Sequence, residues 1–104
     1  MKTIRLHEVA HARAGDKGED TTISVFLYDD TYYDQIVEQI GAEQVRAHFT
    51  GIASGVVECF LLPQLAAVHY VIRGTRKGGV AAALELDAHG KSLGWHLLQM
   101  HVKL

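Results

Sequence analysis

The sequence predicts an α+β fold in which an antiparallel sheet carries helices on one face. Three observations lead to this prediction. The chain has 104 residues, of which 48% are hydrophobic and one is proline, and this suits one compact domain, residues 1–104, with its own core. Several segments alternate apolar and polar residues, as strands do. Between two of these segments, residues 31–40 place apolar side chains at helical spacing.

The first two strands are expected at residues 3–10 and 21–28. Ile4 and Leu6 alternate with polar neighbours in the first segment, which suits a half-buried strand. The second segment is apolar on both faces, because Phe26 lies opposite the face of its aliphatic residues. Such a strand is expected to be covered on both sides.

A helix is expected over residues 31–40, and Asp29, Asp30 and Thr31 are its N-cap candidates. Gly41 interrupts the pattern, and a second short helix over residues 42–49 ends near Gly51. The two helices form a pair or one kinked helix.

The middle of the chain predicts a β-hairpin. Residues 56–62 and 65–72 both have strand composition, and Pro63-Gln64 turns the chain between them. The second strand is apolar on both faces, which predicts a buried, central position in the sheet.

The last quarter is expected to hold a helix within residues 79–98 and a closing strand over residues 99–104. Inward-facing leucines mark the helix, although residues 84–87 alternate as a strand would. From residue 21 onward the order is then β-α-β-β-α-β, the split order of ferredoxin-like domains, with one extra N-terminal strand. The leucines concerned are Leu93, Leu97 and Leu98.

Residues 12–20 are expected to form a polar loop between the first two strands. Two glycines three apart let backbone amides converge on an anion, and two cationic side chains add charge. An ordinary solvated turn has the same composition, so both interpretations stay open. The candidate ligand-binding residues are Arg13, Gly15, Asp16, Lys17 and Gly18, with Asp16 orienting the two cations.

Charge and cysteine content exclude several classes of protein. A net charge of −2 and a pI near 6.4 give no electrostatic footprint for nucleic acid. The chain has no 18-residue apolar run that would span a membrane. Cys59 is the one cysteine, so no internal disulfide can form, and this favours a reducing, cytoplasmic setting. Its side chain is expected to pack in the core.

No metal site or nucleophile is predicted. His7-Glu8-Val9-Ala10-His11 matches a zinc-protease motif, but in a strand the two histidines lie about 13 Å apart, too far to share an ion. Residues 51–55 do not match the spacing of a nucleophile elbow. His11 is the candidate acid or base, because it immediately precedes the loop and histidine titrates near neutral pH. Whether the protein is an enzyme stays open.

Four segments, read together, resemble one family. They are residues 10–18 (AHARAGDKG), 45–49 (VRAHF), 78–80 (GGV) and 86–93 (LDAHGKSL). This combination is similar to the ferredoxin-fold domain at the C-terminus of acyclic-terpene-utilisation protein A, which also occurs as a free-standing chain of about this size.

The resemblance implies a context of acyclic terpene and branched acyl-chain breakdown through coenzyme A thioesters, without implying a reaction. The chain departs from the family at several positions, including residues 22, 24, 64 and 69. Thr22 and Ser24 stand where the family usually has Asn and Gly, and Gln64 and His69 stand where Asn is common.

Two functions follow as expectations. In the first, an accessory subunit or ligand-handling domain holds an anionic metabolite at the 13–18 segment, with a coenzyme A thioester as the possible ligand and no other cofactor. In the second, a non-catalytic module assembles with a larger acyclic-terpene-utilisation-type partner. In both, the second sheet face is expected to pair with another copy of the chain.

Overall fold

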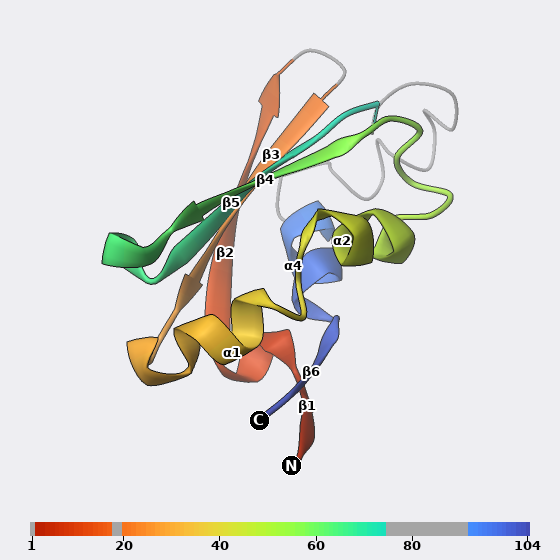
Figure 1. Cartoon of the computed structure of the whole chain (residues 1–104). Coiled ribbons are helices and arrows are strands. Elements are labelled where there is room, and N and C mark those ends of the chain that lie inside the picture. Colours follow the sequence, from red (N-terminus) through yellow and green to blue (C-terminus); the bar gives the residue numbers. More distant parts are fainter. Residues whose placement is uncertain (1, 18–19, 75–91) are drawn as a thin grey trace.

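The structure is a computed structural model and describes residues 2–17, 20–74 and 92–104 (Figure 1). Within these ranges, six strands form two antiparallel sheets. The larger sheet has the order β2-β3-β5-β4, and the smaller one is a ribbon of β1 and β6. The strands are β1 (Thr3–Arg5), β2 (Ala10–Lys17), β3 (Asp20–Leu27), β4 (Val57–Leu62), β5 (Ala67–Ile72) and β6 (His101–Lys103).

Short helices cover one face of the larger sheet (Figure 1). The helix α4 packs against β2 at Gly94. A Cβ atom added at Gly94 would lie 3.7 Å from the Cβ atoms of Ala12 and Ala14. The α-helices are α1 (Tyr33–Val37), α2 (Ala42–His48) and α4 (Ser92–Leu98), and the 3-10 turns are η1 (Leu6–Glu8), η2 (Asp30–Tyr32) and η3 (Pro63–Leu65).

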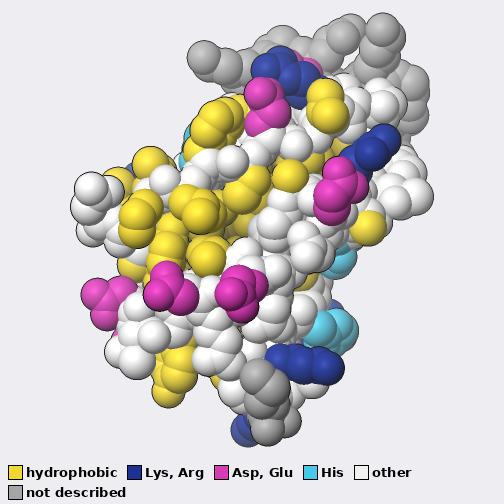
Figure 2. Space-filling view, in the orientation of Figure 1, with side chains coloured by type: hydrophobic (Ala, Val, Ile, Leu, Met, Phe, Trp, Pro, Cys, Tyr) yellow, Lys and Arg dark blue, Asp and Glu magenta, His cyan; other side chains and the backbone are white. Residues whose placement is uncertain are grey.

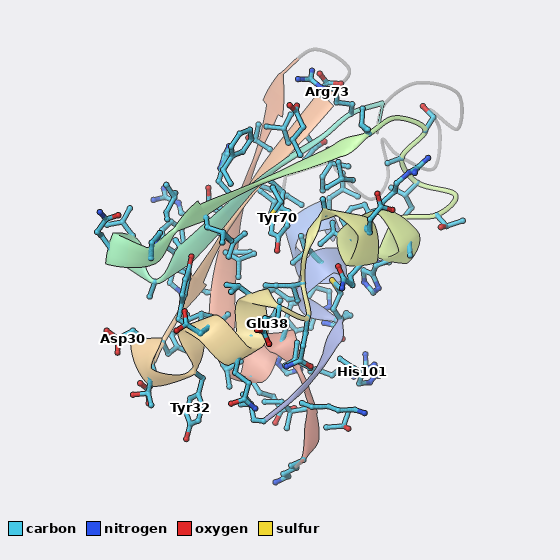
Figure 3. All side chains as sticks on the ribbon, viewed as in Figure 1. Asp30, Tyr32, Glu38, Tyr70, Arg73 and His101 are labelled. Atoms are coloured by element: carbon cyan, nitrogen blue, oxygen red, sulfur yellow. The ribbon has the colours of Figure 1, made fainter. Side chains whose placement is uncertain are left out.

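The core lies between the larger sheet and the helices. Along β3, every second side chain is buried, so Ile23 and Val25 face the helices and are fully buried. From β5, Tyr70 points into the same layer (Figure 3) and donates its hydroxyl hydrogen to the backbone oxygen of Ile40. This bond joins the central strand to the chain that leaves α1.

The α+β fold class is confirmed, and so are several of its elements. The 56–62 and 65–72 segments form the β4–β5 hairpin, and β5 is a central strand, as predicted. The predicted N-cap Asp29 accepts a hydrogen bond from the Thr31 amide at 2.9 Å. Gly41 has extended backbone and begins α2, so it separates the two helices.

The C-terminal helix is confirmed as α4, in which Leu93, Leu97 and Leu98 are buried. The alternating stretch at residues 84–87 lies outside the described residues.

The N-terminal segment corrects the prediction of one strand over residues 3–10. Within that span, β1 is extended, η1 then turns the chain so that Leu6 enters the core, and Ala10 begins β2. The predicted closing strand is the short β6, and it pairs with β1 rather than with the larger sheet. In the larger sheet, the edge position beside β3 is occupied by β2.

The polar segment 12–20 is also different from its prediction, because residues 12–17 are strand. Gly15 lies opposite Thr22 and Lys17 opposite Asp20 in a regular antiparallel register. Polar residues suit β2 because it is an edge strand with one face that no described element covers, and on that face the Arg13 side chain is exposed. The polar, glycine-containing composition that predicted a turn therefore belongs to an edge strand of the sheet.

Candidate functional site

The face of the larger sheet that turns away from the helices is the candidate site, and we call it the open face. No described element covers it, which corrects the expectation that the face carrying Phe26 is covered. Cross-strand partners point to the same side, so the register defines its members. They include His11, Arg13, Thr22, Ser24, Phe26, Tyr28, Phe60, Leu62 and His69.

One row of side chains crosses all four strands of the open face. Arg13 lies opposite Ser24, Ser24 opposite His69, and His69 opposite Phe60. Ser24 Oγ and His69 Nδ1 are 2.8 Å apart, a hydrogen-bonding distance. Arg13 is exposed and forms no ion pair with a described residue. The row thus combines a cation, a hydroxyl and an imidazole.

Aromatic side chains flank this polar row. The ring of His11 is stacked on Phe26, with centroids 5.2 Å apart, and lies 5.5 Å from the ring of Tyr28. On the other flank, Phe60 lies 6.4 Å from His69. Tyr28 is 66% exposed and Phe60 is 48% exposed, so this aromatic surface is accessible.

Of the candidate ligand-binding residues, Arg13, Gly15, Asp16 and Lys17 lie in the strand β2 rather than in a loop. The Tyr28 amide donates to Val9 O at 2.9 Å. Hydrogen-bonded and non-hydrogen-bonded pairs alternate along an antiparallel ladder, so this bond shows which pairs of β2 and β3 are hydrogen-bonded. By that alternation Gly15 and Thr22 form a hydrogen-bonded pair, so the Gly15 amide is not free for an anion. Asp16 and Lys17 are placed by the same register, and Gly18 lies outside the described residues.

The Ser24–His69 contact does not by itself make a catalytic site. A nucleophilic serine needs a base that is oriented by a third group. Within the described ranges, no carboxylate bonds to the imidazole of His69. The candidate acid or base, His11, contacts aromatic rings.

The two histidines of the zinc-protease motif lie in different surroundings. His7 is in η1 with its ring 5.1 Å from Trp95, whereas His11 is in β2 on the open face. In the part of the chain that the structure describes, no group of three or more His, Cys, Asp or Glu residues could hold a metal. Burial raises the pKa of the Cys59 thiol, which disfavours the reactive thiolate.

Sequence reasoning missed a hollow on the helix side of the molecule, lined by both polar and apolar residues. It has a volume of about 500 Å³, and its lining includes Arg5, His48, Gln99 and His101. The Arg5 guanidinium donates to Gln99 Oε1 at 2.9 Å. These residues come from α2, β1 and the β6 end of the chain, so no single sequence motif could have grouped them.

The far end of the sheet carries an ion-pair cluster. The Arg73 guanidinium contacts Asp20 at 3.0 Å and Glu58 at 2.7 Å (Figure 3). Arg73 therefore joins residues of β3 and β4 just after β5 ends. Because these groups are partly exposed, the pairs contribute little stability, but they neutralise the charge of Glu58.

An antiparallel sheet with helices on one face and an uncovered, aromatic second face defines a ferredoxin-like α+β domain. The model of the AtuA ferredoxin-like domain family matches residues 4–103, and the chain belongs to this family. Comparisons with curated proteins and with solved structures return no match. Among the described residues, no helix is long and apolar enough to cross a membrane.

Proposed function

We propose that this chain is a non-catalytic docking domain, an accessory subunit that joins a larger acyclic-terpene-utilisation-type protein through its open face. The observation that carries the proposal is the accessible aromatic surface of His11, Phe26, Tyr28 and Phe60 on a sheet face that no described element covers. Aromatic side chains are enriched in the buried centres of protein interfaces.

The shape of the surface supports a protein partner over a small molecule. Small-molecule sites are concave and bury most of the ligand. The described hollow of about 500 Å³ lies among α2, β1 and the residues around β6, whereas the open face belongs to the larger sheet. In the family that this chain resembles, the domain stands at the C-terminus of larger proteins, so we infer a partner of that kind. Such a partner would act in the breakdown of acyl-CoA compounds.

The test is a complex with such a larger protein that lacks its own copy of the domain. Tyr28→Asp places a charge in the aromatic surface, and because Tyr28 is 66% exposed the variant will fold. We expect it to weaken the complex by about tenfold or more in titration calorimetry. The matched control is Tyr32→Asp, since Tyr32 is also exposed but lies on η2. Absence of a complex, or equal affinity for both variants, contradicts the proposal.

A second candidate function is ligand handling, and the row of Arg13, Ser24 and His69 favours it. The guanidinium would hold the anionic group of an acyl-CoA or similar metabolite, and the hydroxyl and imidazole would bond to it. Phe26 and Phe60 would contact the acyl chain. Pairing of two open faces in a homo-oligomer would enclose such a ligand.

Thermal unfolding separates the two functions. Ligand at about 100 times its Kd adds about 2.7 kcal/mol of stability, which raises the unfolding midpoint by roughly 10–20 °C for a domain of this size. We expect Arg13→Gln to abolish stabilisation by an acyl-CoA, whereas Arg46→Gln, which changes an exposed arginine on α2, retains it. If no acyl-CoA stabilises the wild type, ligand handling is wrong and docking is unaffected.

A further inference from the structure

The strand β4 ends the larger sheet, and its outer edge pairs with no described strand. Its burial falls along its length, so that Phe60, Leu61 and Leu62 are exposed by 48%, 54% and 38%. Val56 and Leu65 flank them and are 60% and 62% exposed. Figure 2 shows hydrophobic side chains gathered over this strand and its hairpin.

Natural sheets protect such edges with charges, prolines, bulges or a covering element. The opposite edge strand, β2, carries the charged residues Arg13, Asp16 and Lys17. In contrast, Glu58 is the one charge between Val56 and Leu65. An apolar edge of this kind is a template for another strand.

The hydrogen-bond alternation shows which backbone groups this edge offers. The Arg73 amide donates to Val56 O at 3.1 Å, and the Leu27 amide donates to Ala66 O at 2.9 Å. The first bond shows that the odd-numbered residues of β5 bond to β4, and the second shows that its even-numbered residues bond to β3. On β4, the residues that bond to β5 are therefore the even-numbered residues 58, 60 and 62. The N–H and C=O groups of Val57, Cys59 and Leu61 therefore point outward, away from β5.

These outward groups are self-complementary. A two-fold axis perpendicular to the sheet, midway between the Cys59 residues of two copies, pairs β4 antiparallel with β4 of the second copy. Each outward residue then meets an outward residue, because Val57 lies opposite Leu61 and Cys59 opposite itself. On the open face, Val56 lies opposite Leu62, so exposed apolar side chains cover each other.

Charge does not oppose this pairing. The carboxylate of Glu58 already contacts Arg73 at 2.7 Å, which reduces repulsion between the two copies. The whole chain carries a net charge of only −2, so long-range repulsion is small as well. A second copy of the chain thus matches the edge in hydrogen bonding, in hydrophobicity and in charge.

We propose that the chain forms a symmetric dimer through β4, in which two four-stranded sheets join into one continuous antiparallel sheet. The two open faces then lie side by side on one surface, and each stays free for its larger partner. The dimer does not depend on the proposed docking function, since it uses the edge of the sheet rather than its face. The interface is small, so we expect Kd on the order of 1–100 μM.

Analytical ultracentrifugation in the presence of a reductant tests the dimer. We expect the wild type to pass from monomer to dimer as its concentration rises. Val56→Glu and Leu62→Lys each place unpaired charges against apolar side chains near the axis and weaken the dimer by about tenfold or more. Tyr32→Lys, on η2, leaves the dimer unchanged. Circular dichroism confirms that the variants fold, as their exposed positions predict.

Mixing the two edge variants tests the register. In the mixed dimer, the carboxylate introduced at position 56 of one copy would face the ammonium group introduced at position 62 of the other. On the second side of the axis, Leu62 still meets Val56. We therefore expect an equimolar mixture of Val56→Glu and Leu62→Lys to dimerise at concentrations where neither variant does so alone. A wild type that stays monomeric at all concentrations, or a mixture without dimer, overturns the proposal. The docking proposal is tested apart from it by Tyr28→Asp.

Discussion

His48 and His96 bind to each other's backbone. Nε2 of His48 donates to His96 O at 2.6 Å, and Nε2 of His96 donates to His48 O at 2.8 Å. Their rings stack with centroids 4.2 Å apart. The two bonds join the C-terminal end of α2 to α4 and fix the tautomer of each ring, because a carbonyl oxygen only accepts. Burial lowers the pKa of His48, and the neighbouring His96 and His101 lower it further.

This pKa shift predicts a loss of stability in acid. The folded state holds His48 neutral below its ordinary pKa of 6.5, whereas the unfolded chain takes up a proton there. The contribution of His48 to stability is thus present above pH 6.5 and is lost as pH falls through the folded pKa. We expect His48→Gln to flatten the pH dependence of the free energy of unfolding, measured with urea. Equal slopes in wild type and variant would contradict the assignment.

Ser24 and His69 are neighbours on the open face. They lie opposite each other on β3 and β5, and Ser24 Oγ and His69 Nδ1 share a hydrogen bond of 2.8 Å. The sequence separates them by 45 positions, so only the register of β3 and β5 brings them together.

At the scale of elements, the contact between α4 and β2 depends on small residues. Gly94 faces Ala12 and Ala14, and the three together let the helix approach the edge strand closely. The space at Gly94 accepts one methyl group, because a Cβ there would meet its neighbours at 3.7 Å, an ordinary van der Waals distance. A side chain larger than that of alanine would overpack this contact.

We therefore expect Gly94→Ala to stabilise the protein by about 0.5–1 kcal/mol, since alanine favours the helix over glycine by about that amount. Gly94→Leu should destabilise it by about 1–3 kcal/mol through overpacking. Gly74→Ala is the contrasting variant. Gly74 has φ +73°, and its Cβ would lie against Ser54 Oγ, so this change should destabilise the protein. Urea unfolding measures all three, and a less stable Gly94→Ala would show that the contact is tighter than described.

The elements that the sequence predicted well are those whose pattern is set by the core. Residues 21–28 and 65–72 alternate because one or both faces are buried, and both became strands of the larger sheet. The polar segment 12–17 was misassigned because an edge strand with an exposed face has the composition of a turn. The pairing of β1 with β6 could not be predicted either, since three-residue strands far apart in the sequence leave no periodic signal.

The same reasoning explains what was missed at the candidate site. Arg13 was selected for a loop, and it lies on the open face instead. The open face itself was expected as an association surface, but its polar row depends on cross-strand register, which no local pattern shows. The apolar edge of β4 was visible in the sequence as Phe60-Leu61-Leu62, yet only the sheet order reveals that nothing described pairs with it.

At the scale of the whole molecule, the ribbon of β1 and β6 ties the two ends of the described chain together. The amides of Lys2 and Leu104 each donate to the other's carbonyl oxygen, at 2.7 and 2.9 Å. Gln39 extends the connection to the segment after α1, because its side chain bonds to both the N–H and the C=O of Lys103. Val102 and Leu6 are fully buried, so the ribbon shares the core of the larger sheet.

If the ribbon and the larger sheet share one core, they should unfold together. Val102→Ala removes two buried methyl groups and should lower the free energy of unfolding by about 1.5–3 kcal/mol. Trp95, the one tryptophan, lies on α4 beside His7, and its fluorescence reports on the contact between this helix and η1. Circular dichroism reports on the sheet and helices together. We expect the two signals to give one coincident urea transition in wild type and variant, with an unchanged m value. Separate transitions in the variant would mean that the ribbon opens by itself, and that the two sheets are stabilised independently.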